Sequence, residues 1–196
     1  MAAILCYQIK IQTNIKATIM ATTKWSLDPT HSEIGFKVKH LMFTNVSGHF
    51  KTFTASAETD GDNFSNAKIE FCADTDSIST NNEQRDDHLK GTDFFDAGSF
   101  PKITFSATNL ADKGDGEYEL TGNLDMHGVS HPVKLNVEFG GIVKDPWGNI
   151  KAGFSIHGKL NRKDFGLNWN AVLETGGVMV SEEVKIHGEI QLVKQA

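Results

Sequence analysis

The chain is poor in residues that cross-link a protein or anchor it in a membrane. It has 196 residues and 2 cysteines, Cys6 and Cys72, too few to predict a disulfide framework. No stretch reaches the roughly 18 apolar residues of a membrane helix. Near the N-terminus only Ala2 to Tyr7 form an apolar run, which is shorter than a secretory signal requires. We therefore expect no integral membrane segment and a cytoplasmic location, with the periplasm as the alternative.

Basic charge is also scarce. Lys and Arg number 19 against 25 Asp and Glu, which gives a net charge of -6, and no basic cluster occurs in the sequence. Nucleic acids and anionic membrane surfaces both select basic patches. We therefore expect no nucleic acid among the partners.

Common catalytic motifs are missing as well. The sequence contains no Gly-x-Ser-x-Gly elbow, no phosphate-binding glycine-rich loop and no His-Glu-x-x-His helix. His127 and His131 flank a turn, so they would not share the helix face that a metal-binding pair needs. We expect no metal site, no cofactor and no catalytic residue.

One dense polar cluster is present, at Arg85-Asp86-Asp87-His88. An acid, a base and a cation close together could perform general acid–base chemistry. They could equally form a solvated helix face or hold a loop by ion pairs. Arg85, Asp86 and His88 are therefore candidates either for head-group contacts or for a structural clamp.

The chain is rich in stretches where apolar and polar residues alternate with a period of two. The clearest runs from Tyr118 to Phe139, where the alternation stops at a turn over residues 127–132 and then resumes, as in a β-hairpin with one apolar face. Similar stretches along the chain predict about eight antiparallel strands and an all-β fold.

Short helices are expected at two places. Thr80-Asn81-Asn82-Glu83 has the pattern of a capping box and predicts a short helix that runs to about Lys90. A second helical piece is expected within Asn168 to Leu173.

The free edges that an open sheet of about eight strands would have favour its closure into a barrel. A long antiparallel sheet with free edges pairs with other chains, and a barrel removes the edges. An eight-stranded barrel has an interior just wide enough for packed side chains or for one slim ligand. Phe numbers 13 against 2 Tyr and 3 Trp, so the large rings carry few polar groups and suit an aliphatic ligand as well as a solid core. Both interiors remain open.

The candidate lining of a cavity consists of residues that share the inward phase on successive strands. They are Phe36, Val38, Phe71, Ile103, Phe105, Leu120, Leu124, Met126, Val133, Leu135, Val137 and Phe154. Small residues in the same phase either leave space between the large rings or only allow the strands to coil. They are Ala67, Ala73, Gly122, Ala152 and Gly188.

Several linked motifs occur in a fixed order along the chain. The central ones are Ser77-Ile78-Ser79-Thr80, Arg85-Asp86-Asp87-His88-Leu89-Lys90, Asp93-Phe94-Phe95-Asp96 and Phe100-Pro101-Lys102-Ile103-Thr104-Phe105. Trp25-Ser26-Leu27-Asp28-Pro29-Thr30-His31-Ser32 precedes them, and Arg162-Lys163-Asp164-Phe165-Gly166 follows them. Together these motifs resemble the YceI-like polyisoprenoid-binding family over about Trp25 to Val193.

The resemblance implies an extended, lipocalin-like antiparallel barrel whose long apolar pore takes an isoprenoid tail, such as that of a quinone or its precursor. We expect the barrel domain to occupy residues 22–196. Residues 1–21 lack the alternation and the resemblance, so we expect a leader or extension that is poorly ordered. Family members are often dimers, so a homodimer is expected, and many members are exported.

The expected function is binding, storage or transport of a long-chain isoprenoid lipid, without catalysis. Two alternatives remain: an enzyme that acts on an isoprenoid head group, and a ligand-free β-barrel scaffold. A pocket with a paired acid and base at its mouth would favour the enzyme. An interior without a continuous cavity would favour the scaffold.

Overall fold

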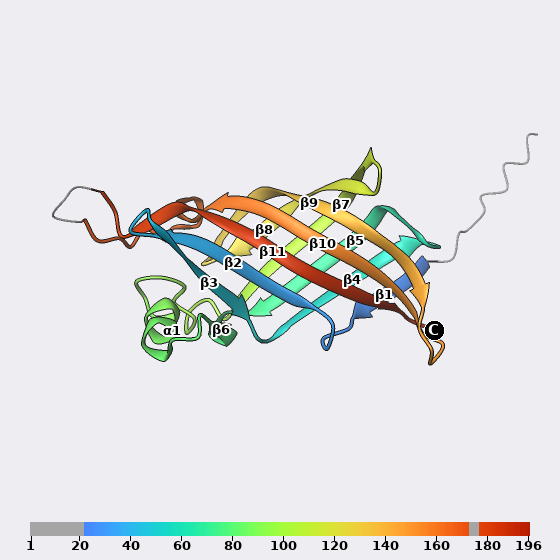
Figure 1. Cartoon of the computed structure of the whole chain (residues 1–196), viewed down its shortest axis with the longest axis horizontal. Helices are drawn as coiled ribbons and strands as arrows, with labels where there is room; N and C mark the ends of the chain where they lie inside the picture. Colours follow the sequence, from blue (N-terminus) through green and yellow to red (C-terminus); the bar gives the residue numbers. More distant parts are fainter. Residues whose placement is uncertain (1–21, 173–176) are drawn as a thin grey trace, which may run out of the picture.

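The alternating stretches form the wall of a closed barrel in the computed structural model, which describes residues 22–172 and 177–196 (Figure 1). The wall strands are β1 (Thr22–Leu27), β4 (Phe53–Asp60), β5 (Asn63–Asp74), β7 (Lys102–Gly114), β8 (Glu117–Met126), β9 (Val129–Lys144), β10 (Ile150–Asn161) and β11 (Val180–Lys194). They pair in this order, and β11 returns to pair with β1. Every neighbouring pair is antiparallel. The predicted eight-stranded antiparallel barrel is confirmed.

Two further strands extend this wall. β2 (Glu33–His40) pairs with β11 beyond the point where β1 pairs with it. β3 (Thr44–Phe50) pairs with β2 much as β4 pairs with β1. Two of the eight wall positions are therefore each shared by two shorter strands. The predicted extension at residues 1–21 lies outside the described residues.

The break between β1 and β2 is held in place by Asp28. Its carboxylate accepts hydrogen bonds from Lys151 on β10 and Gln191 on β11, both at 2.9 Å, and from the Thr30 hydroxyl at 2.7 Å. Lys151 is the main reason that the pKa of Asp28 lies well below its ordinary value. The carboxylate therefore stays charged and ties the bend to two neighbouring strands.

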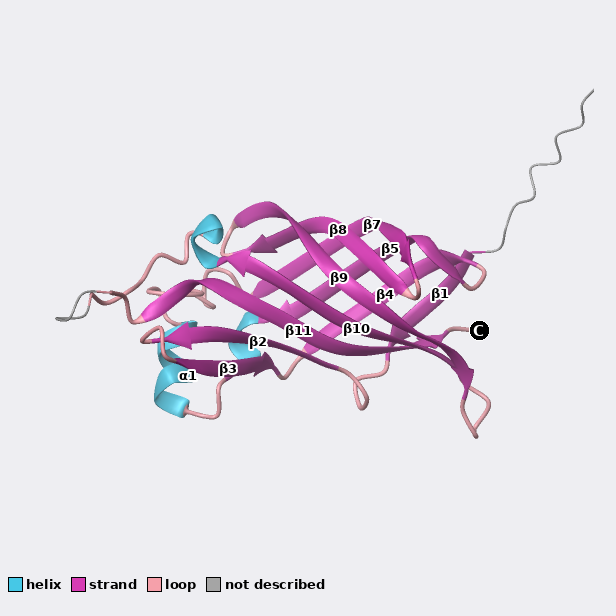
Figure 2. Cartoon of the chain, turned by 45° about the horizontal axis from the view of Figure 1, so that its top comes forward, coloured by secondary structure: helices cyan, strands magenta, loops and turns pink. Residues whose placement is uncertain are grey.

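An insertion lies between β5 and β7. It contains the 3₁₀ turn η1 (Thr75–Ser77), the short strand β6 (Ile78–Ser79), which pairs with β3, and helix α1 (Glu83–Lys90). These segments and a second 3₁₀ turn, η2 (Arg162–Phe165), gather at the end of the barrel opposite the C-terminus (Figure 2). We call this end the helical end and the opposite end the far end.

The predicted helix ending at Lys90 is present, but its predicted capping residue is wrong. α1 begins at Glu83, and Asn82 is its N-cap, accepting a hydrogen bond from the Arg85 backbone N–H at 2.9 Å. Thr80 does not cap the helix because its N–H and its hydroxyl both donate to the Asp86 carboxylate.

The second helical piece was predicted at the wrong place. Residues 168–171 have no regular structure, Val172 forms an isolated bridge, and residue 173 lies outside the described residues. The helical turn is η2, which comes earlier in the chain. Asn161 caps it by accepting from the Lys163 N–H at 3.0 Å, and Gly166, at φ 75°, ends it in the left-handed conformation that glycine tolerates.

Buried apolar side chains form two groups along the barrel. The larger group includes Trp25, which is 1% exposed and donates its indole N–H to the Thr59 hydroxyl at 2.9 Å. The smaller group, at the helical end, consists of Ile103, Met126, Phe165 and Leu167.

Candidate functional site

An apolar cavity of about 210 Å³ lies inside the barrel. Its lining draws on β2, β3 and every wall strand except β1. On β11 the lining runs from Val184 to Leu192, which is roughly 26 Å of strand at about 3.3 Å per residue. Since barrel strands tilt by about 35–45°, this corresponds to roughly 20 Å along the barrel axis. A small volume spread over this length makes the cavity a slim channel.

The volume of the channel limits what it can hold. An apolar cavity of about 150 Å³ is enough for a benzene ring, whereas pockets for drug-sized ligands measure about 300–1,000 Å³. At about 210 Å³ the channel therefore fits a slim apolar segment, and a longer chain requires lining side chains to change rotamer.

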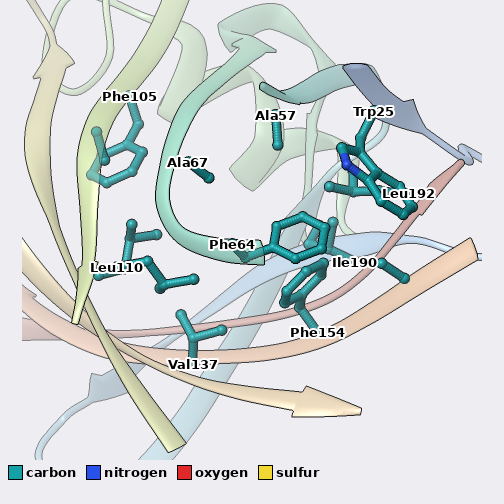
Figure 3. Close-up of a cluster of buried hydrophobic side chains, with 13 residues drawn as sticks. Trp25, Ala57, Phe64, Ala67, Phe105, Leu110, Val137, Phe154, Ile190 and Leu192 are labelled. Atoms are coloured by element: carbon teal, nitrogen blue, oxygen red, sulfur yellow. The ribbon is translucent and has the colours of Figure 1, made fainter. Parts of the chain in front are cut away.

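Aromatic rings pack together toward the far end of the barrel, where Phe64 lies between Trp25 and Phe154 (Figure 3). The Phe64 ring lies 5.0 Å from the ring of Phe154, 5.1 Å from Trp25 and 5.7 Å from Phe139, measured between centroids. Phe64 is 6% exposed and also lines the channel. At the helical end Phe95 and Leu167 line the channel instead, so the two ends differ in composition.

Inward-facing glycines let large side chains lie against the wall. A Cβ added at any of four glycines would overlap with a lining side chain of the neighbouring strand. The pairs are Gly48 with Phe36, Gly122 with Phe105, Gly158 with Leu135 and Gly188 with Ile34. One interpretation of the sequence is that the small residues leave empty space between the large rings. At these glycines the structure contradicts it, because side chains from the neighbouring strand occupy the space. The glycines receive side chains that would otherwise project into the channel.

The geometry agrees with comparisons to known proteins. Residues 25–192 match the model of the YceI-like domain. This chain belongs to the YceI-like family. A UPF0312 protein of Staphylococcus aureus is 37% identical over 170 residues, covering 86% of this chain and 96% of that protein. A UPF0312 protein of Vibrio parahaemolyticus is 39% identical over 137 residues, covering 70% of this chain and 72% of that protein.

Solved structures share the YceI-like barrel. The Campylobacter jejuni YCEI protein is 32% identical, with a TM-score of 0.69 and coverage of 87% of this chain and 97% of that one. Burkholderia cenocepacia BcnA has a TM-score of 0.73 at 22% identity, covering 84% and 98% of the two chains. A polyisoprenoid binding domain from Saccharophagus degradans has a TM-score of 0.61 at 16% identity, covering 87% and 98%. At these low identities the last two show a common fold alone.

The candidate lining residues lie on the channel of this YceI-like barrel with one exception. Phe36, Phe71, Ile103, Phe105, Leu120, Leu124, Met126, Val133, Leu135, Val137 and Phe154 all line it. Val38 does not, although it pairs in register with Val46 and Val184. Val38 is the next residue after Phe36 with the same inward phase on β2, and it lies closer to the β2–β3 turn. Phe36 is the last residue of β2 that lines the channel.

The structure divides the polar cluster on α1 and places none of its members on the channel lining. Arg85 donates to the hydroxyl and the carbonyl of Thr80, at 2.7 and 2.9 Å. Asp86 accepts from the Thr80 N–H at 2.7 Å and from the Ser79 hydroxyl at 3.3 Å. His88 lies apart, with Nε2 3.1 Å from the Asp93 carboxylate. Arg85 and Asp86 thus connect α1 to Thr80 and to Ser79 at the end of β6, and His88 has no part in that connection.

We expect Asp86→Asn to loosen α1. Burial alone would raise the pKa of the Asp86 carboxyl, but the hydrogen bonds from Thr80 and Ser79 and the Arg85 charge outweigh burial and lower it. The stability that the ionised Asp86 carboxylate contributes to the fold is therefore complete above the pKa of an unfolded Asp, about 3.9. It is lost as the pH falls through the lower pKa of Asp86 in the folded protein. Loss of the charged hydrogen bonds should cost about 1–3 kcal/mol at pH 7.

Hydrogen exchange of the Glu83–Lys90 amides and denaturant unfolding at pH 7 and pH 3 would measure this effect. The Asn variant should lose less stability than the parent when the pH is lowered. Asp87→Asn is the matched control on the same helix, because it makes the same chemical change at an exposed carboxylate, and it should cost at most about 0.5 kcal/mol. Equal loosening of α1 by both variants would contradict the clamp.

Residues 22–172 and 177–196 lack two features that would indicate other functions. No group of three or more His, Cys, Asp or Glu side chains in these ranges is placed to hold a metal ion. Within the same ranges, no helix is both long and apolar enough to cross a bilayer.

Sequence reasoning missed several lining residues. Phe95 comes from the irregular part of the insertion, where a period of two carries no information. Phe50 and Arg162 could have been found. Phe50 is in phase with the inward Gly48, and Arg162 continues the inward phase of Leu160 past the end of β10. Arg162 was overlooked because a charged residue is normally assigned to the outer face.

Proposed function

We propose that this protein binds a long-chain isoprenoid lipid in the channel of its barrel and stores or transports it, the tail being that of a quinone or a prenyl precursor. The observation that carries the proposal is the slim apolar channel, enclosed by the barrel wall and lined by aliphatic and aromatic side chains. Membership of the YceI-like family and the shared fold with a polyisoprenoid binding domain support it.

Energetics favour a carrier over an enzyme. Removal of each methylene from water is worth about 0.8 kcal/mol, so a prenyl tail gains strongly when it leaves water. A bilayer is equally apolar, and transfer from membrane to barrel should therefore be close to neutral. Reversible exchange with membranes suits storage and transport. The homodimer and the cytoplasmic location stay predictions.

The two alternatives have less support. The described residues that line the channel do not include Arg85, Asp86 or His88. A head group in the channel would therefore not meet the paired acid and base that an enzyme of this kind needs. A solid scaffold would have no channel of about 210 Å³. Neither alternative is favoured by a specific observation.

Native mass spectrometry of the purified protein, followed by solvent extraction and lipid analysis, tests the proposal. We expect an adduct whose mass and fragmentation identify an isoprenoid. Protein stripped of lipid should also bind geranylgeraniol, which supplies a prenyl tail with a small neutral head. The absence of both an isoprenoid adduct and geranylgeraniol binding would overturn the proposal. Conversion of the lipid on incubation would favour an enzyme instead.

A further inference from the structure

Arg162 has an unusual position for a charged residue. It begins η2 at the end of β10, is only 4% exposed, and lines the channel. Its Nε donates to the Ser181 carbonyl at 3.0 Å, and its Nη1 donates to the Leu167 carbonyl. Its Nη2 has no partner. Among residues 22–172 and 177–196, it is the single buried side-chain nitrogen or oxygen without a hydrogen bond.

No carboxylate of the described chain forms an ion pair with Arg162. The acidic group that acts on it, Glu182, is about half exposed and pairs with Lys163. Burial lowers the pKa of Arg162, and the Glu182 charge opposes the shift only in part. A guanidinium remains charged in proteins even so. The helical end of the channel therefore holds a buried cation with a free donor and without a partner anion among the described residues, a state that is unfavourable.

Arg162 differs from the other polar residues on the lining, which are Ser56 and Lys159. Both are exposed, and Lys159 forms an ion pair with Glu183 at 3.3 Å. Arg162 is thus the one buried polar side chain among the described lining residues. Its immediate surroundings include Leu160 and Leu167, which also line the channel.

We propose that Arg162 binds the oxyanion of an amphiphile whose apolar tail occupies the channel, through its unpaired Nη2. This inference rests on the proposed function and narrows its ligand class. A neutral acceptor, such as a quinone carbonyl or an alcohol, would satisfy the donor but leave the charge uncompensated. A phosphate or carboxylate does both, and charge-assisted hydrogen bonds to Arg are the stronger ones. The structure therefore assigns the channel to anionic prenyl lipids before neutral ones.

The test uses three ligands with one tail: geranylgeranyl phosphate, geranylgeranoic acid and geranylgeraniol. Calorimetric titration into lipid-stripped full-length protein measures each Kd. Charged hydrogen bonds are worth about 1.5–3 kcal/mol, so the parent protein should bind the anions on the order of 10- to 100-fold more tightly than the alcohol. Comparison of phosphate with carboxylate shows which oxyanion the site prefers.

Arg162→Met should remove the preference for anions, because the affinity for the two anions should fall far more than the affinity for geranylgeraniol. Arg162→Lys, which keeps the charge, should retain part of the preference. Lys159→Met is the matched control, because it removes an exposed, ion-paired cation from the same lining, and it should leave the preference intact. The preference should also persist at high salt, since a buried pair is screened much less than a surface pair.

The outcomes separate this inference from the proposed function. If the parent protein binds the alcohol and the anions equally, the Arg162 site is refuted while the lipid-binding function stands, and this result needs no variant to fold. Loss of the preference in Lys159→Met, or its survival in a folded Arg162→Met protein, would also refute it. If no prenyl ligand binds the parent, the proposed function itself fails.

Discussion

We expect Phe64→Ala to lower the free energy of unfolding by about 3–5 kcal/mol, the range for truncation of a buried Phe. Phe64 is 6% exposed, and its ring lies about 5 Å from those of Trp25 and Phe154 at the far end of the barrel. Truncation would remove these contacts and join a new void to the channel. Because the surrounding β-strands are paired on both sides, the wall can collapse only partly into that void.

Denaturant unfolding of lipid-stripped protein measures this effect, with the midpoint and the slope compared between variants. Phe43→Ala is the matched control, because Phe43 is 82% exposed at the β2–β3 turn, and it should change stability by less than about 0.5 kcal/mol. A loss of under about 1 kcal/mol in Phe64→Ala would contradict the tight packing of the Phe64 ring against Trp25 and Phe154. Added geranylgeraniol should recover part of the loss, because a ligand that binds only the folded state stabilises it.

Local pattern accounts for much of the fold. The hairpin predicted from Tyr118 to Phe139 appears as β8 and β9, with Leu120 opposite Leu135 on the inward face. The period of two was sufficient here because one face meets an apolar interior and the other meets water. The break between β1 and β2 could not be predicted in this way. It depends on Lys151 and Gln191, which lie more than 100 positions from Asp28 along the chain.

The sequence could predict which side chains of the candidate site face inward, but not how these side chains pack against one another. Inward phase placed Phe36 and Phe105 on the lining correctly, yet it could not show that their rings lie against Gly48 and Gly122. Whether a barrel is solid or hollow depends on such contacts between strands. The α1 cluster shows the same limit, since Arg85 and His88 are close in sequence but reach Thr80 and Asp93 respectively.

Gly158→Ala should narrow the channel and weaken binding of prenyl lipids by about 5- to 150-fold, since overpacking costs about 1–3 kcal/mol. An added Cβ would overlap with the Leu135 side chain, which lies opposite Gly158 on β9. The overlap involves the end of a flexible leucine, and the nearest backbone atom is 3.6 Å away. The backbone can therefore stay in place while the Leu135 methyl group moves into the channel.

Gly153→Ala on the same strand is the matched control, because nothing lies within 4 Å of an added Cβ at that position. It makes the same chemical change and should leave the Kd for geranylgeraniol unaltered. Both variants should remain folded, so circular dichroism and the unfolding midpoint are measured beside the calorimetric Kd. Equal affinities for the parent and Gly158→Ala would mean that the lipid does not pass Leu135, and equal losses in both variants would mean that the effect is not steric. A selective loss in Gly158→Ala would locate the tail beside β9 and β10, about midway along the channel lining.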